Sequence, residues 1–265
     1  MAGVGLARRD TSFAATLAVP AVSHLSCDAR RTLAGVWEFR ANAEREAELR
    51  FARLEQELRS HDALVEAIAL AERAVSDERR HVTICSELAR AYSGDEPRLV
   101  PASARPLGPA ALGPRDRLLY EIVAFCCISE SFNASLMKVA SDRASVPETR
   151  AALRAILRDE VGHARLGWAH LAAERMRGRG AFLSELSPRM LAGAIRSELF
   201  TPGPPHQDAD VLETHGELGE RERLAIFETA AHTVILPGFE AQGIDTRPMR
   251  DWIERMQRRG TDVRA

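Results

Sequence analysis

The sequence predicts an all-α fold, and three observations carry that prediction. Apolar residues recur every three or four positions over long stretches, which is the periodicity of helices with one buried face. Alanine and leucine, both strong helix formers, are abundant, whereas aromatic residues make up only 5% of the 265 residues. Runs of β-branched residues, which favour strands, are missing.

The first two helices are joined by a short turn. We expect the first over residues 29–58 and the second from the turn to about residue 92. Ser60 or Asp62 can cap the second helix, because either side chain can accept a hydrogen bond from a free backbone N–H. Gly94 ends it, since glycine adopts the left-handed conformation that closes many helices.

A proline-rich connection follows over residues 94–115 and holds five of the 13 prolines. So long a loop is unusual unless it crosses from one end of a bundle to the other. The third helix is expected over 115–140 and the fourth over 148–178. The sequence therefore predicts a four-helix bundle with a long crossover between its second and third helices.

Additional helices are expected beyond the bundle, over 182–199, 217–242 (interrupted near Pro237) and 247–259, with the Pro/Gly-rich segment 201–205 between the first two. We expect them to pack on the bundle and to form either a lid or the surface of a homodimer. The predicted organisation is an irregular N-terminal lead-in (1–28), the four-helix bundle (29–178) and C-terminal helices (179–265).

Composition limits the class of partner and the compartment. Apolar content of 45%, charged content of 28% and a net charge of −2 are ordinary for a globular protein and give no indication of nucleic-acid binding. No apolar run reaches the roughly 18 residues that a membrane span needs, so we expect no membrane association. The four cysteines form no C-x-x-C pair, which favours a reducing, cytoplasmic compartment.

The N-terminus carries a weak alternative to that location. Arg8 and Arg9 precede a partly apolar stretch, residues 13–25, that faintly resembles a secretion signal. Asp10, Pro20 and His24 interrupt the pattern, and no clean cleavage site follows, so export is the less favoured interpretation.

Two Glu-x-x-His strings are the most informative feature of the chain. Glu78 and His81 lie in the second predicted helix, and Glu160 and His163 lie in the fourth. Positions three apart share one helix face, so each string directs a carboxylate and an imidazole at one point. Two such strings, with one glutamate from each of two other helices, form the ligand set of a di-iron or di-manganese bundle.

The third and first helices offer the two further glutamates. Glu130 lies about 14 residues before the second hairpin turn, level with Glu160. In the first helix, Glu44 lies level with Glu78 and within the apolar stripe, whereas Glu48 reproduces the 30-residue separation between Glu130 and Glu160. We favour Glu44 and keep Glu48 as the alternative.

Carboxylates and imidazoles suit two iron ions, an Fe/Mn pair or two manganese ions better than a structural zinc site. Six inward polar groups would also be costly in an apolar core without a cation. Asp77 and Asp159 precede the two motifs, and each can accept the N–H of a histidine across the bundle, Asp77 from His163 and Asp159 from His81.

At these positions the chain resembles the ferritin-like superfamily, and within it a bacterial branch described only as ferritin-like. The resemblance covers about residues 33–172 and extends weakly to 234–237. The matching pieces are Trp37, Ala43-Glu44, Phe51-Ala-Arg53, Asp77-Glu78-x-x-His81, Ala91-Tyr-Ser-Gly94, Cys127-Ile-Ser-Glu130, Asp159-Glu160-x-x-His163 and Gly167-Trp168. In that branch the Glu44 position belongs to the motif and the Glu48 position does not. This chain departs from it at Arg45-Glu46-Ala-Glu48, where the branch tends to have histidine and small residues.

The resemblance implies a fold and a metal site but leaves the reaction open. Our leading hypothesis is an oxidoreductase that activates O2 or peroxide at a buried di-iron or Fe/Mn site, with a small-molecule substrate and an external electron donor. One alternative is an iron- or manganese-handling ferroxidase that does not assemble into a cage. The other is a non-catalytic helical interaction protein.

Overall fold

In the computed structural model, residues 20–196 and 208–262 are described, and they form helices with no strand among them. This confirms the all-α prediction. The long elements are α1 (Cys27–Ser60), α2 (Val65–Ser93), α5 (Pro147–Met176) and a continuous helix made of α3 (Pro114–Ile122), the π-helical stretch η2 (Val123–Glu130) and α4 (Ser131–Arg143). The predicted signal-like segment lies mostly in residues 1–19, outside the described part.

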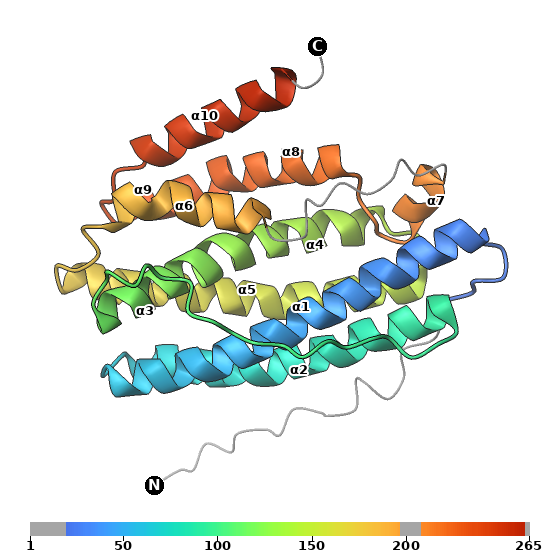
Figure 1. Cartoon of the computed structure of the whole chain (residues 1–265), viewed down its shortest axis with the longest axis horizontal. Coiled ribbons are helices and arrows are strands. Elements are labelled where there is room, and N and C mark those ends of the chain that lie inside the picture. The colour runs from blue at the N-terminus through green and yellow to red at the C-terminus, as the bar shows by residue number, and fades with distance from the viewer. Residues whose placement is uncertain (1–19, 197–207, 263–265) are drawn as a thin grey trace, which may run out of the picture.

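These long helices lie side by side (Figure 1). α1 packs along α2, α2 along α5, and α5 along both η2 and α4. Trp37, Phe51 and Leu54 of α1 are fully buried, and each such side chain contributes roughly 1.5–3 kcal/mol to folding.

The turn between α1 and α2 corrects one prediction. Neither Ser60 nor Asp62 caps α2, because that helix begins one turn later, after Leu64, without a side-chain cap. Asp62 instead takes a left-handed backbone conformation (φ 51°) that reverses the chain. The predicted end of α2 at Gly94 (φ 86°) is confirmed.

The proline-rich crossover is fastened along α1 (Figure 1). Glu38 accepts a hydrogen bond from the backbone N–H of Arg98 (2.8 Å), and Asn42 accepts one from Val100 (2.8 Å). Further along α1, Arg50 donates to the carbonyl of Arg105 (3.0 Å). The loop therefore satisfies several of its backbone groups on the bundle although it has no secondary structure of its own.

The continuous helix Pro114–Arg143 corrects another expectation. It is long and apolar enough to cross a membrane, with a mean hydropathy of 1.3 in an 18-residue window, although the sequence suggested no such segment. Of that window, 61% is buried inside the protein. This is weak evidence for a span, because a helix at the centre of a folded core passes the same test.

The C-terminal helices cover one side of the long helices (Figure 1). They are α6 (Leu183–Arg196), α7 (Ala209–Thr214), α8 (Glu220–Ala230), the π-helical η4 (Ala231–Ile235), α9 (Leu236–Ala241) and α10 (Arg247–Asp262). α6 packs on η2, and α8 packs on α4. The expected segment 201–205 lies outside the described residues.

Two features of this region were not predicted. α7 is too short to show a periodic pattern, and Pro237 does not interrupt the helix around it. η4 ends two residues before this proline and widens the helix, which accommodates a ring that would otherwise clash with a carbonyl one turn earlier.

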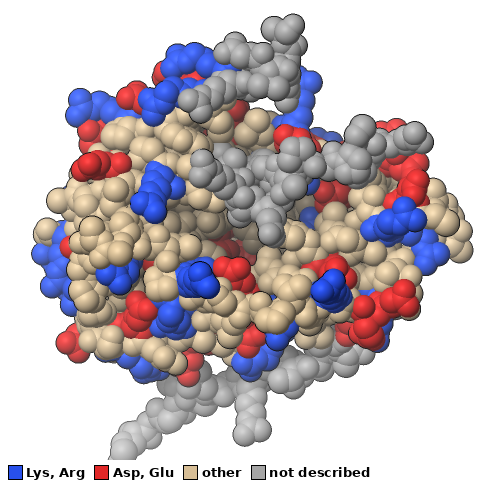
Figure 2. All heavy atoms as spheres, in the orientation of Figure 1, with Lys and Arg blue, Asp and Glu red and all other residues tan. Residues whose placement is uncertain are grey.

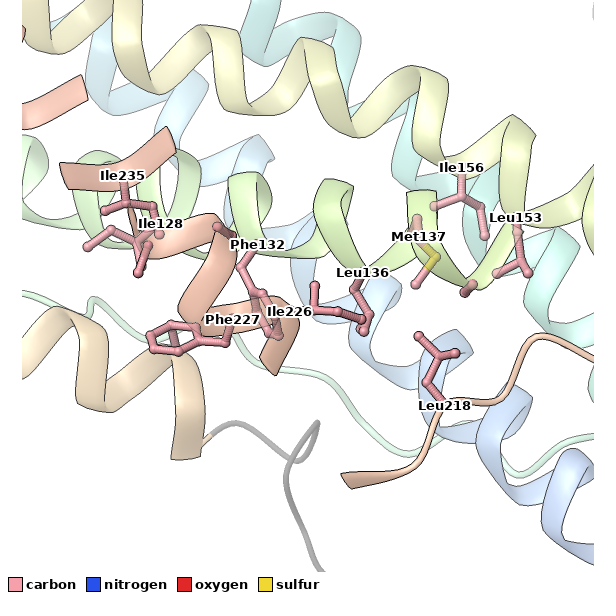
Figure 3. Close-up of a cluster of buried hydrophobic side chains, with 14 of the residues drawn as sticks. Ile128, Phe132, Leu136, Met137, Leu153, Ile156, Leu218, Ile226, Phe227 and Ile235 are labelled. Carbon is pink, nitrogen blue, oxygen red and sulfur yellow. The ribbon is translucent and has the colours of Figure 1, made fainter. Parts of the chain in front are cut away.

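Apolar side chains join the C-terminal helices to α4 and α5 (Figure 3). Phe132 of α4 meets Phe227 of α8 edge to face, with ring centroids 5.4 Å apart. Both rings are fully buried.

On the face of the molecule in Figure 2, acidic and basic side chains are interspersed rather than gathered by sign.

Candidate metal centre

Four helices bring the six predicted ligands to one place in the core. Their donor atoms fall into two overlapping groups, and within each group all donor atoms lie within 4.8 Å of one another. One group is Glu44, Glu78, His81 and Glu160, and the other is Glu78, Glu130, Glu160 and His163. Glu78 and Glu160 belong to both groups, as two bridging carboxylates would.

The histidines present the same nitrogen to the carboxylates. His81 Nδ1 lies 3.1 Å from a Glu78 oxygen and 3.6 Å from a Glu160 oxygen. His163 Nδ1 lies 3.2 Å from a Glu160 oxygen and 3.1 Å from a Glu78 oxygen. The two Glu-x-x-His strings therefore face each other, each reaching the glutamate of the other.

The structure distinguishes the two candidates on α1 by position. An oxygen of Glu44 lies 3.8 Å from His81 Nδ1, and the Glu44 side chain is only 12% exposed. Glu48 instead accepts hydrogen bonds from Arg79, whose side chain is 69% exposed. Glu44 is thus inside the cluster and Glu48 outside it; the role of Glu44 as a ligand stays a prediction.

The remaining nitrogen of each histidine points at the aspartate suggested by the sequence. His81 Nε2 lies 3.2 Å from Asp159 Oδ2, within hydrogen-bond distance. His163 Nε2 lies 3.7 Å from Asp77 Oδ2, beyond it. Such a carboxylate fixes the imidazole tautomer that leaves Nδ1 free to bind a cation.

Sequence reasoning missed Arg80, which joins these aspartates. Its Nη2 donates to Asp77 Oδ1 (2.8 Å) and to Asp159 Oδ2 (2.5 Å). Burial alone would raise the pKa values of both aspartates, but their contacts with the histidines and their hydrogen bonds to Arg80 lower them. The position of Arg80 between Glu78 and His81 was the one signal in the sequence that could have pointed to it.

A close helix approach positions Glu130. A Cβ atom added to Gly167 of α5 would lie 2.7 Å from both the Cβ of Cys126 and the backbone nitrogen of Cys127. Only glycine permits this contact between α5 and η2. η2 ends at Glu130, and such π-helical stretches are frequent at functional sites.

Burial and the neighbouring charges shift the pKa values of the cluster. Burial and the charge of Glu44 raise the pKa of Glu78, and burial and the charge of Glu160 raise that of Glu130 well above its usual range. Burial opposes charge on His81 as well, but its contacts with Asp159 and the glutamates raise its pKa well above the usual value. Without a cation, the site thus favours taking up protons.

One of two unsatisfied buried polar atoms at the cluster, Glu160 Oε1, indicates that a positive ligand fits here. Among the described residues, neither Glu160 Oε1 nor His163 Nε2 has a hydrogen-bond partner. Buried polar atoms are rarely left unsatisfied. Glu160 Oε1 belongs to the cluster, so a cation shared with His81 would satisfy it.

Other polar residues on these helices lie apart from the cluster or serve packing. Cys126 and Cys127 are fully buried in the core. His170 is buried, and burial lowers its pKa to about 4.

The comparisons with family models, curated proteins and solved structures found no match to this chain.

Proposed function

We propose that the chain is a di-metal carboxylate protein with a ferritin-like four-helix bundle, and that it is an oxidoreductase acting on O2 or peroxide. The observation that carries the proposal is the pair of overlapping donor groups that share Glu78 and Glu160. One such group would suit a single cation. Two groups with two shared carboxylates suit two adjacent ions.

The donor chemistry favours redox-active cations. Oxygen and imidazole donors without thiolate suit iron and manganese. The four glutamates carry four negative charges when ionised, which two divalent ions neutralise while both imidazoles stay neutral. Two ions held here would supply redox equivalents and open coordination positions for O2 or peroxide.

The chain's own residues would prepare that chemistry. Asp159 orients His81, and Glu78 and Glu160 would each contribute to holding two cations. The apolar core around the cluster excludes water; Phe51, for example, packs with its ring centroid 4.9 Å from that of His163. A dry, preorganised site of this kind strengthens electrostatic interactions with bound ions.

Metal content tests the proposal. We expect about two iron or manganese ions per chain in the wild type and far less in Glu160→Ala, which removes a shared ligand. Glu44→Ala should lose metal as well, whereas Glu48→Ala, a matched change on the same helix, should retain it. A folded wild-type protein that binds no metal would refute the proposal and leave a non-catalytic helical protein.

The reaction needs a second test, because a metal site alone does not separate an oxygen-activating enzyme from a ferroxidase. Oxidation of an organic substrate under O2, with an external electron donor, would support the leading hypothesis. Oxidation of Fe(II) alone, with no substrate turned over, would favour the iron-handling alternative.

A further inference from the structure

The two histidines of the cluster are held unequally at their outer nitrogens. His81 Nε2 makes a 3.2 Å hydrogen bond to Asp159, whereas His163 Nε2 lies 3.7 Å from Asp77 and has no hydrogen-bond partner among the described residues. The inner nitrogens, in contrast, have nearly the same surroundings. The two histidines therefore differ in the partners of their outer nitrogens and not in the contacts of the nitrogens that face the cluster.

One position of the sequence repeat accounts for this difference. Asp77-Glu78-x-x-His81 aligns with Asp159-Glu160-x-x-His163, which places Arg80 opposite Gly162. Arg80 reaches across the bundle to Asp159, but Gly162 has no side chain to reach back to Asp77.

Arg80 acts on the two aspartates differently. It holds Asp159 through Oδ2, the same oxygen that faces His81 at hydrogen-bond distance. It holds Asp77 through Oδ1, and the other oxygen, Oδ2, remains beyond hydrogen-bond distance from His163. Arg73 Nε also lies 3.6 Å from Asp77 Oδ2.

We propose that Arg80 is a positioning residue that makes the two cation positions unequal, so that the first divalent ion binds at the position of Glu44 and His81. This rests on the proposed dinuclear site. The hydrogen bond from His81 to Asp159 fixes the imidazole with Nδ1 free, so that position is organised before the ion arrives. Losing such an outer partner typically weakens metal binding about 10- to 100-fold.

Titration with Mn²⁺ alone tests the inference, with calorimetry for affinity and anomalous X-ray scattering at one equivalent for position. In the wild type we expect two binding steps, with the first ion beside His81. Repulsion between two cations also produces two steps, so the variants decide. Asp159→Asn should weaken the first step about tenfold or more, and Asp77→Asn should change it less than about threefold.

Arg80 has a matched control in its neighbour. Arg80→Gln should weaken the first step in the same direction as Asp159→Asn, and the double variant should be no weaker than Asp159→Asn alone, because both remove one interaction. Arg79→Gln removes an adjacent, mostly exposed arginine that pairs with Glu48, and should leave the step unchanged. Circular dichroism confirms that each variant is folded.

The outcomes separate this inference from the function on which it rests. If Mn²⁺ added at one equivalent occupied both positions equally, the inference would be overturned and the dinuclear site would stand. Equal effects of Asp159→Asn and Asp77→Asn, or of Arg80→Gln and Arg79→Gln, would also overturn it. A wild-type protein that binds no Mn²⁺ and no iron would refute the dinuclear site itself.

Discussion

Replacing Gly167 by alanine should impair the metal centre from a position that offers no ligand. The new Cβ would lie 2.7 Å from Cys127 N and 2.8 Å from Cys127 Sγ, whereas ordinary contact begins at 3.4 Å. Backbone cannot rotate away, so α5 and η2 must separate by several tenths of an ångström. Overpacking of this kind costs about 1–3 kcal/mol, partly offset by the roughly 1 kcal/mol that alanine gains over glycine in a helix.

That separation matters for binding because metal–ligand distances tolerate deviations of only about 0.2 Å. η2 carries Glu130, and α5 carries Glu160 and His163. We therefore expect Gly167→Ala to lose about 1–2 kcal/mol in the free energy of unfolding and to bind the second ion markedly more weakly. Urea denaturation of the metal-free protein and Mn²⁺ calorimetry measure the two effects.

Gly162 provides the control on the same helix. No atom lies within 4 Å of a Cβ built there, so Gly162→Ala should stabilise the protein by up to about 1 kcal/mol and leave metal binding unchanged. If Gly167→Ala proved as stable as Gly162→Ala and bound two ions normally, the close approach of η2 and α5 would not be what positions Glu130.

Three further predictions concern stability. The pKa of His170 falls from 6.5 to about 4 on folding, so below pH 6.5 the unfolded chain binds a proton that the folded chain does not bind. The free energy of unfolding should therefore fall as the pH drops from 6.5 to 4, by at most about 3 kcal/mol. Urea titrations should show a shallower fall in His170→Gln. Gly238→Ala would place a Cβ 2.4 Å from the Trp168 ring and should cost about 1–3 kcal/mol, whereas an unchanged melting temperature would contradict that packing. Glu121→Gln removes a fully buried carboxylate paired with two arginines and should lower the free energy of unfolding by about 3 kcal/mol. Glu46→Gln, at a side chain 52% exposed, should lower it by less than about 1 kcal/mol. Similar losses for both variants would refute the argument from burial.

Much of the arrangement could be predicted from spacing alone. Two residues three positions apart share a helix face whatever surrounds them, so Glu78 with His81 and Glu160 with His163 required no tertiary information. Equal distances from a hairpin turn then placed Glu44 level with Glu78. Asp77 and Asp159 followed, because each precedes a motif and can accept the N–H of a histidine across the bundle.

What could not be predicted depends on contacts between helices. The π-helical stretch η2 contains no proline or glycine, and its apolar sequence is compatible with an ordinary α-helix. The choice is made by packing, where Gly167 admits η2 at a distance that no sequence pattern encodes. Arg80 was missed for a related reason: an arginine on a helix is usually solvated, and its hydrogen bond to Asp159 depends on how the helices pack.

The same core that stabilises the fold makes the polar cluster expensive, and this conflict is the strongest argument for a cation. Burying an unpaired carboxylate costs several kcal/mol, and at most 1% of the surface of Glu78 or Glu160 is exposed. Structural ion pairs elsewhere in the chain resolve such a cost with arginine, as Glu121 does with Arg50. In the cluster the carboxylates face imidazoles and one another instead. Arg80 donates to Asp77 and Asp159, which lie behind the histidines. Positive charge at the centre must then come from bound protons or from metal ions, and the shared geometry of two donor groups is one that protons alone do not require.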